Sequence, residues 1–165
     1  MKISETVEYP AAPDVVFAML TDERFQGRKC EQAGALSHDV AVTRLDAGRR
    51  VVTRRELPTE NLPDFAKSLI GRRLMITETY EWAAPDGDGS RTGELTVELG
   101  GAPVSLRARL ALVPAGNGTQ MRLDGKLKAS VPLIGGRIER TAAPAIIDGI
   151  RSEGTVGRAW LSEQR

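Results

Sequence analysis

The stretch Val131-Pro132-Leu133-Ile134-Gly135-Gly136 leads directly into a helical pattern that begins at Arg137 and ends near Leu161. Apolar or small residues recur at helical spacing along one face of this pattern, and arginines lie roughly opposite. The apolar stripe consists of Ile138, Ala142, Ala145, Gly149, Val156 and Trp160, with Ile146 at its edge. One amphipathic helix cannot bury its own apolar face, so the expected partner is a curved sheet with one apolar face.

A proline and three glycines interrupt the helical pattern. Pro144 removes one backbone hydrogen bond, so we expect a kink between Arg140 and Pro144. Gly149, Gly154 and Gly157 each weaken a helix by about 1 kcal/mol relative to alanine. Two interpretations follow: either tertiary packing tolerates the glycines, or small residues leave space between the helix and the sheet.

Composition describes an ordinary globular chain and excludes several classes of protein. The length of 165 residues suits a single domain over residues 1–165, and the net charge of +1 gives no electrostatic footprint for nucleic acid. Cys30 and His38 are each alone, so we expect no disulfide, no metal site and no cofactor. Met1 to Pro10 is too polar for a signal peptide and no apolar run could span a membrane. We therefore expect a cytoplasmic protein, monomeric or homodimeric.

Period-two alternation predicts seven antiparallel strands, each with one dry and one wet face. The first covers Ile3 to Tyr9, and two short helices follow, one opened by Pro13-Asp14 and one running from Glu23 to about Ala33. Residues expected on the dry face of the later strands are Leu36, His38, Val40, Val51, Thr53, Arg55, Leu74, Ile76, Glu78, Tyr80, Leu95, Val97, Leu106, Ala108 and Leu127.

One insertion breaks this meander between the third and fourth strands, from Pro58 to Gly71. Pro63 and Asp64 suit a helix start, and Phe65 and Leu69 form a small apolar side. The helix either plugs the end of the core or acts as a lid over a cavity mouth. A second yielding point is expected at Gly135-Gly136, where the backbone dihedrals are unusually free.

The order of elements, covering essentially the whole chain, resembles the helix-grip fold of the START-like, or SRPBCC, superfamily. Three pieces resemble an uncharacterised branch of it, a domain of unknown function: Glu56-Leu57-Pro58 with Leu62-Pro63-Asp64-Phe65, the strand start Thr92-Gly93, and 131–139. The resemblance implies an α+β fold, with a seven-stranded curved antiparallel sheet wrapped around the long C-terminal helix and two short helices after the first strand. It also implies a deep apolar cavity, and its members bind lipids, sterols, polyketides or hormones, while some are cyclases or hydrolases.

The expected ligand-binding residues combine the dry sheet face, the inserted helix and the inward helix stripe. They are Leu36, His38, Val40, Arg55, Phe65, Leu69, Leu74, Ile76, Glu78, Tyr80, Leu95, Val97, Leu106, Ala108, Ile138, Ala142, Ala145, Ile146 and Gly149. Among them Glu78 is a carboxylate on an apolar face, so it is either paired, with Arg55 as the candidate partner, or placed in water by a bulge.

Catalytic signals are weak, and no catalytic residue is assigned. The chain has no Ser-His-Asp order, phosphate loop or metal-ligand spacing. The first function class is therefore a binder or carrier of a hydrophobic small molecule. The alternative is a cyclase or dehydratase that uses His38, Glu78 or Tyr80 in the same cavity. A third class is a protein whose cavity is filled by its own side chains and which acts through its surface.

Overall fold

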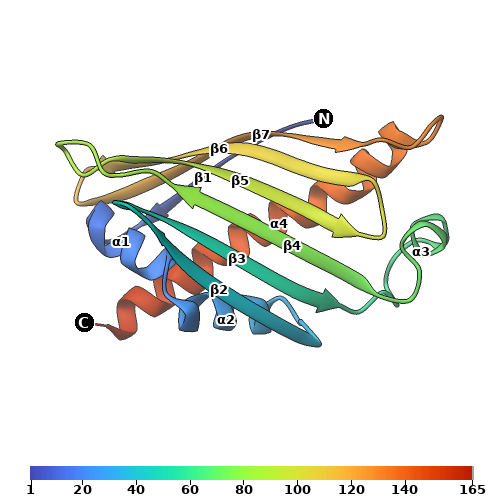
Figure 1. Ribbon diagram of the computed structural model, residues 1–165, viewed down its shortest axis with the longest axis horizontal. Helices are drawn as coiled ribbons and strands as arrows, with labels where there is room; N and C mark the ends of the chain where they lie inside the picture. Colours follow the sequence, from blue (N-terminus) through green and yellow to red (C-terminus); the bar gives the residue numbers. More distant parts are fainter. Residues whose placement is uncertain (165) are drawn as a thin grey trace.

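A computed structural model describes residues 1–164 and shows seven antiparallel strands curving around one long helix (Figure 1). In chain order the elements are β1 (Lys2–Tyr9), α1 (Pro13–Leu20), α2 (Glu23–Gln32), β2 (Ser37–Leu45), β3 (Gly48–Leu57), α3 (Asp64–Ile70), β4 (Leu74–Trp82), β5 (Arg91–Gly100), β6 (Val104–Ala115), β7 (Gly118–Ala129) and α4 (Gly135–Glu163). The predicted helix-grip arrangement, with two short helices after the first strand, is confirmed.

The sheet is a meander from β2 to β7, and β1 joins it beside β7 to give the order β1-β7-β6-β5-β4-β3-β2. The register places Glu78 of β4 opposite Val97 of β5, and Val97 opposite Leu106 of β6. These positions share one face of the sheet, because side chains of paired residues point the same way. That face turns toward α4, and it carries most of the predicted apolar residues.

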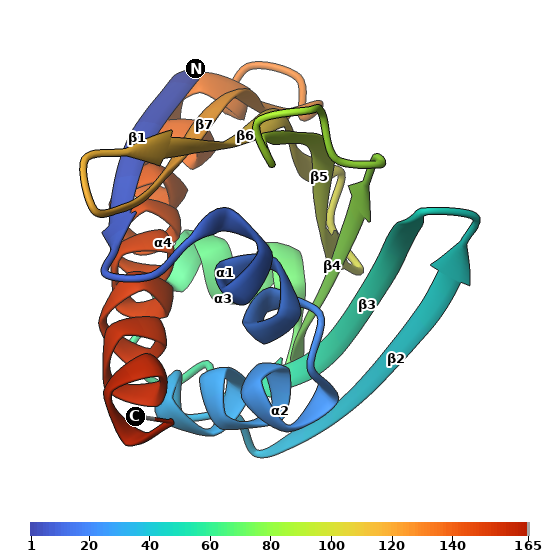
Figure 2. The same cartoon turned by 90° about the vertical axis from the view of Figure 1, so that its left-hand side faces the viewer.

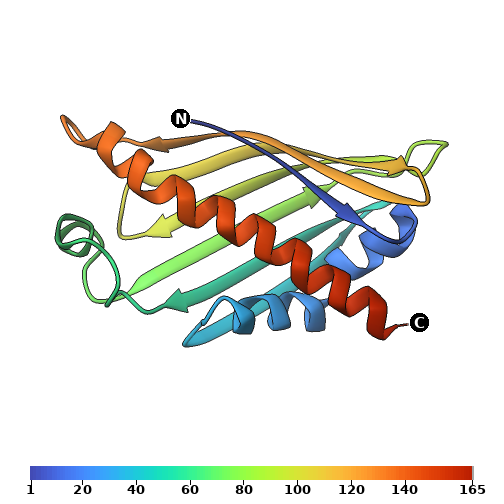
Figure 3. The same cartoon turned by 180° about the vertical axis from the view of Figure 1, so that it is seen from behind.

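Helix α4 is longer than the sequence pattern predicts, since it begins at Gly135 and ends at Glu163. It runs without a break past Pro144 (Figure 3). Pro144 is exposed, so water can solvate the backbone carbonyl that the proline leaves without its usual donor. Gly135 lies in the first helical turn, where an added Cβ would overlap the carbonyl oxygen of Ala129, so this glycine serves close packing.

Two glycines of α4 are in close packing contacts with β1, and a third borders open space. A Cβ at Gly154 would lie 2.5 Å from Val7 Cγ1, and one at Gly157 would lie 2.6 Å from Tyr9 Cε1. These two glycines therefore let α4 pack closely on β1. A Cβ at Gly149 would meet nothing within 4 Å. Gly149 is thus the one of the three that borders open space.

The predictions that Leu36 and His38 face the cavity are wrong, and the position of helix α2 explains why. Helix α2 packs against β2, inside the curve of β2 and β3 (Figure 2). The ring of His38 lies beside Gly27 of α2, where an added Cβ would be 3.2 Å from His38 Nε2, and His38 is exposed. Leu36 precedes β2 and is 65% exposed. The inner face of β2 therefore meets α2 rather than α4, and neither residue faces the interior.

The three short helices begin and end near the predicted residues. Asp22 caps α2, accepting a hydrogen bond of 2.8 Å from the Arg24 backbone N–H. The inserted helix α3 is followed by Gly71 at φ 83°, a conformation that favours glycine. Within residues 1–164, no helix is long and apolar enough to cross a membrane.

Candidate functional site

A cavity of about 410 Å³ lies between the sheet and helix α4. Its walls come from β3 to β7, the inward side of α4, the end of α2 and one side of α3. Leu95, Val97 and Leu106 line it from the sheet, and Ile138 and Ala142 line it from α4. This cavity therefore lies between the sheet and α4, the two elements whose apolar faces were expected to pack against each other.

Most of the predicted binding residues border this cavity. They are Arg55, Phe65, Leu69, Leu74, Ile76, Glu78, Tyr80, Leu95, Val97, Leu106, Ile138, Ala142, Ala145, Ile146 and Gly149. Four predicted residues do not: Leu36 and His38 are exposed outside it, Val40 packs against the core, and Ala108 is buried in the core. Ala108 faces Leu95 and Gly125 across the sheet register, which places it among neighbouring strands.

Five side chains form a polar cluster in one wall of the cavity: Lys29, Arg55, Glu78, Tyr80 and Glu153. Lys29 Nζ lies 2.9 Å from Glu78 Oε2 and 2.9 Å from Glu153 Oε2. Arg55 Nη2 lies 2.8 Å from Glu78 Oε1. Four elements, α2, β3, β4 and α4, therefore converge on one buried network of ionised groups.

The sequence left open whether Glu78 pairs with Arg55 or reaches water, and the structure shows the Arg55–Glu78 pair. Glu78 is only 8% exposed, so it does not reach water through a bulge. The Tyr80 hydroxyl lies 3.2 Å from Glu153 Oε2 and 3.4 Å from Glu78 Oε2, and it donates its proton between them. Lys29 Nζ also lies 5.0 Å from the centre of the Tyr80 ring, a cation–π distance.

Glu78 and Lys29 keep their charges at neutral pH. Burial alone would raise the pKa of Glu78, but the charges of Lys29 and Arg55 outweigh burial and lower this pKa to about 2. Burial alone would lower the pKa of Lys29, but Glu153 and Glu78 hold it well above its ordinary value. Burial raises the pKa of Tyr80, so its hydroxyl keeps its proton. Burial likewise raises the pKa of the Cys30 thiol, which disfavours the reactive thiolate.

Sequence reasoning missed Lys29 and Glu153, although each carried a signal. Glu153 lies between Gly149 and Val156 on the apolar stripe, at helical spacing from both. Lys29 lies four residues after Phe25, which is fully buried, and so shares its helix face. A charge on the buried face of each of two helices could have predicted that they pair.

We place the mouth of the cavity between α4, α3 and the end of α2, because every exposed lining residue lies on α4 or at the end of α2 and no residue of α3 is buried. On α4 the residues Ala145, Gly149 and Ser152 both line the cavity and are exposed. On α3 both Phe65 and Leu69 line the cavity, and no residue of α3 is buried. The Arg137 guanidinium lies 4.2 Å from the centre of the Phe65 ring, which connects α3 with the first turn of α4.

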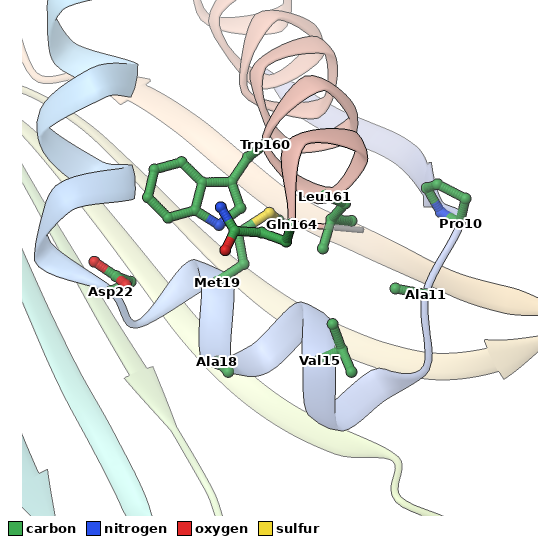
Figure 4. A pocket seen from close by; sticks show the side chains of 9 residues that line it. All are labelled: Pro10, Ala11, Val15, Ala18, Met19, Asp22, Trp160, Leu161 and Gln164. Carbon is green, nitrogen blue, oxygen red and sulfur yellow. The ribbon is translucent and has the colours of Figure 1, made fainter.

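A second pocket of about 370 Å³ lies where the last turns of α4 meet α1 (Figure 4). Its lining residues are Pro10, Ala11, Val15, Ala18, Met19, Asp22, Trp160, Leu161 and Gln164. Asp22 is its ionisable residue, and this carboxylate is paired with Arg24 at 2.8 Å. Since the internal cavity joins apolar walls to a buried ionic network, it is the stronger candidate for a binding site. Among residues 1–164, no group of three His, Cys, Asp or Glu side chains is placed to hold a metal ion.

The sheet order and the single long helix that the sheet wraps define a helix-grip fold of the START-like type. The chain belongs to the family described as "Protein of unknown function (DUF2505)", whose model matches residues 4–161. Uncharacterised proteins of Mycobacterium tuberculosis and Mycobacterium bovis are 26% identical over 119 residues, which is 71% of this chain and 68% of theirs.

Solved structures share the fold at low sequence identity. TTHA0849 from Thermus thermophilus has a TM-score of 0.62 and 17% identity, with 98% of this chain and 99% of that chain covered. A STAR-related lipid transfer protein fragment from Xanthomonas axonopodis has a TM-score of 0.61 and 14% identity, with 98% of this chain and 85% of that chain covered. These similarities concern the fold alone.

Proposed function

We propose that this protein binds a hydrophobic small molecule, such as a lipid, sterol or polyketide-like compound, in the cavity between the sheet and α4. The observation that carries the proposal is the cavity itself, about 410 Å³ of space with mainly apolar walls and one polar cluster. Pockets for small molecules have this character, since apolar walls supply affinity and a few polar groups fix orientation. The structural neighbour named for lipid transfer agrees with this class of ligand.

Catalysis by a cyclase or dehydratase mechanism has less support. His38, one of its three candidate residues, lies outside the cavity. Glu78 is held ionised by two cations, with a pKa of about 2, so it is a poor proton donor and a weak base at neutral pH. Tyr80 keeps its proton and donates it to carboxylates of the cluster. The polar cluster is therefore better suited to orienting a bound molecule than to exchanging protons with it.

The experiment is native mass spectrometry of the purified protein, combined with binding of the neutral apolar dye N-phenyl-1-naphthylamine. We expect a co-purified apolar mass or saturable dye binding. Val97→Phe should weaken either signal, because Val97 lines the cavity and a larger side chain takes up part of its space. Thr96→Phe on the opposite face of the same strand is the matched control. A folded wild-type protein with no bound mass and no dye binding would refute the proposal.

A further inference from the structure

The polar cluster is balanced in charge. Lys29 and Arg55 supply two cations, and Glu78 and Glu153 supply two anions, each within 2.9 Å of a partner of opposite sign. The side chains of all four are at most 11% exposed. An ion that enters this wall of the cavity therefore meets no unpaired counter-ion.

Few donors and acceptors of the cluster remain free for a ligand once its internal hydrogen bonds are made. Arg55 Nη2 is bonded to Glu78, while Arg55 Nε and Nη1 make no hydrogen bond with the described residues and are closed off from any probe in the cavity. Lys29 has three N–H donors and gives two of them to Glu78 and Glu153. Glu153 Oε2 accepts from Lys29 and Tyr80, while Oε1 accepts from no residue that the structure describes. One free donor on Lys29 and one free acceptor on Glu153 thus lie on neighbouring groups.

We propose that the cavity selects a neutral amphiphile whose polar end is a hydroxyl or carbonyl oxygen, held between Lys29 and Glu153, with its apolar part extending toward α3. This inference rests on the proposed function and names the ligand class for that site. A hydroxyl accepts from Lys29 and donates to Glu153, so it satisfies both groups. A carbonyl accepts from Lys29 alone and is the weaker match.

Charged head groups fit poorly for a physical reason. A carboxylate would lose its hydration and come to lie beside Glu78 and Glu153, with both nearby cations already paired. An ammonium would come to lie beside Lys29 and Arg55 in the same way. The charge-balanced cluster therefore favours neutral over charged ligands. The apolar walls contribute affinity for the apolar part of the ligand and do not distinguish its head group.

The test uses three probes with one chain length: 1-octanol, octanoate and octylammonium. Each competes with N-phenyl-1-naphthylamine for the wild-type protein at neutral pH. We expect 1-octanol to bind at least about tenfold more tightly than either ion, a difference of about 1.4 kcal/mol. Equal or tighter binding of octanoate or octylammonium overturns the inference and leaves the proposed function standing. If the dye does not bind and no apolar mass co-purifies with the protein, the proposed function itself fails.

A variant changes the charge balance. Glu153→Gln gives the cluster a net positive charge, so octanoate should gain about tenfold relative to 1-octanol. Glu81→Gln is the control, because Glu81 is exposed on the same strand as Glu78 and pairs with Arg50 outside the cavity. An unchanged preference in a folded Glu153→Gln variant overturns the inference. If this variant does not fold, the wild-type comparison of the three probes decides alone.

Discussion

Lys29 Nζ and Glu153 Oε2 lie 2.9 Å apart, so an ion pair joins helix α2 to helix α4 inside the protein. The two residues are far apart in the sequence, and each is buried. Because the same ammonium also contacts Glu78 of β4, it links two helices to the sheet. Removal of one member of such a network leaves a buried charge without its partner, which typically costs about 3–5 kcal/mol.

Glu78→Gln should lower the free energy of unfolding by about 3 kcal/mol at neutral pH. The folded state lowers the pKa of Glu78 from its ordinary 4.5 to about 2, and each unit corresponds to about 1.4 kcal/mol. This stabilisation is complete above about pH 4.5 and is lost as the pH falls toward 2. Urea unfolding of wild type and variant at several pH values measures the difference. A difference that persists undiminished at acid pH would show that ionisation of Glu78 is not its source.

Alanine at two glycines of α4 should have opposite effects. Gly149→Ala should stabilise the protein by about 1 kcal/mol, because its Cβ enters open space and alanine favours a helix. Gly154→Ala should destabilise it by about 1–3 kcal/mol, because its Cβ meets Val7 at 2.5 Å. Thermal melting of the two variants measures both effects. Equal shifts of the same sign would contradict the packing described for α4.

Leu106→Asp should prevent folding, since Leu106 is 1% exposed and an aspartate there would bury an unpaired charge. Arg107→Asp, on the wet face of the same strand, should fold normally because position 107 is exposed. Circular dichroism and melting distinguish the two. Near-wild-type melting of Leu106→Asp would show that the inward face of β6 is assigned wrongly.

Phe65→Ala should speed the uptake and release of an apolar fluorescent dye more than it lowers stability. Phe65 lines the cavity mouth on α3, where no residue is buried, and it contacts Arg137 of α4. We expect α3 to open as a lid on the microsecond-to-millisecond scale. Stopped-flow fluorescence measures the exchange rates.

Phe25→Ala is the control for this lid. Phe25 is fully buried, so its truncation should cost about 3–5 kcal/mol. If Phe65→Ala costs as much as Phe25→Ala and leaves the exchange rates unchanged, Phe65 is part of the core and α3 is not a lid.

Local sequence patterns predicted the sheet and α4, because apolar residues recur every second position on the buried face of a strand and about every 3.6 positions on the buried face of a helix. Leu95, Val97 and Leu106 follow that rule closely. Leu36 and His38 follow the alternation too, but what covers β2 is α2, and no local pattern specifies which element lies over an edge strand. The tertiary arrangement of the helices therefore decides whether a residue on the apolar face of β2 is buried or exposed, and the local pattern does not.

The candidate site was predictable where its residues are apolar and only partly predictable where they are charged. Arg55 and Glu78 were recognisable as partners, since they lie on the dry faces of neighbouring strands. Lys29 lies in a segment whose neighbours, such as Arg28 and Glu31, are charged, so its burial is hidden by composition. Glu153 could be matched to it only by knowing that α2 and α4 meet.

The buried network also determines how α4 is positioned along its own axis. An apolar stripe tolerates sliding, because a shift by one turn, about 5.4 Å, brings similar side chains to similar places. Glu153 has no such equivalent position, since a shift of one turn would separate it from Lys29 and leave that ammonium with Glu78 alone. The Lys29–Glu153 ion pair thus fixes the position of α4 along its axis relative to the sheet. It thereby also determines the shape of the cavity between α4 and the sheet.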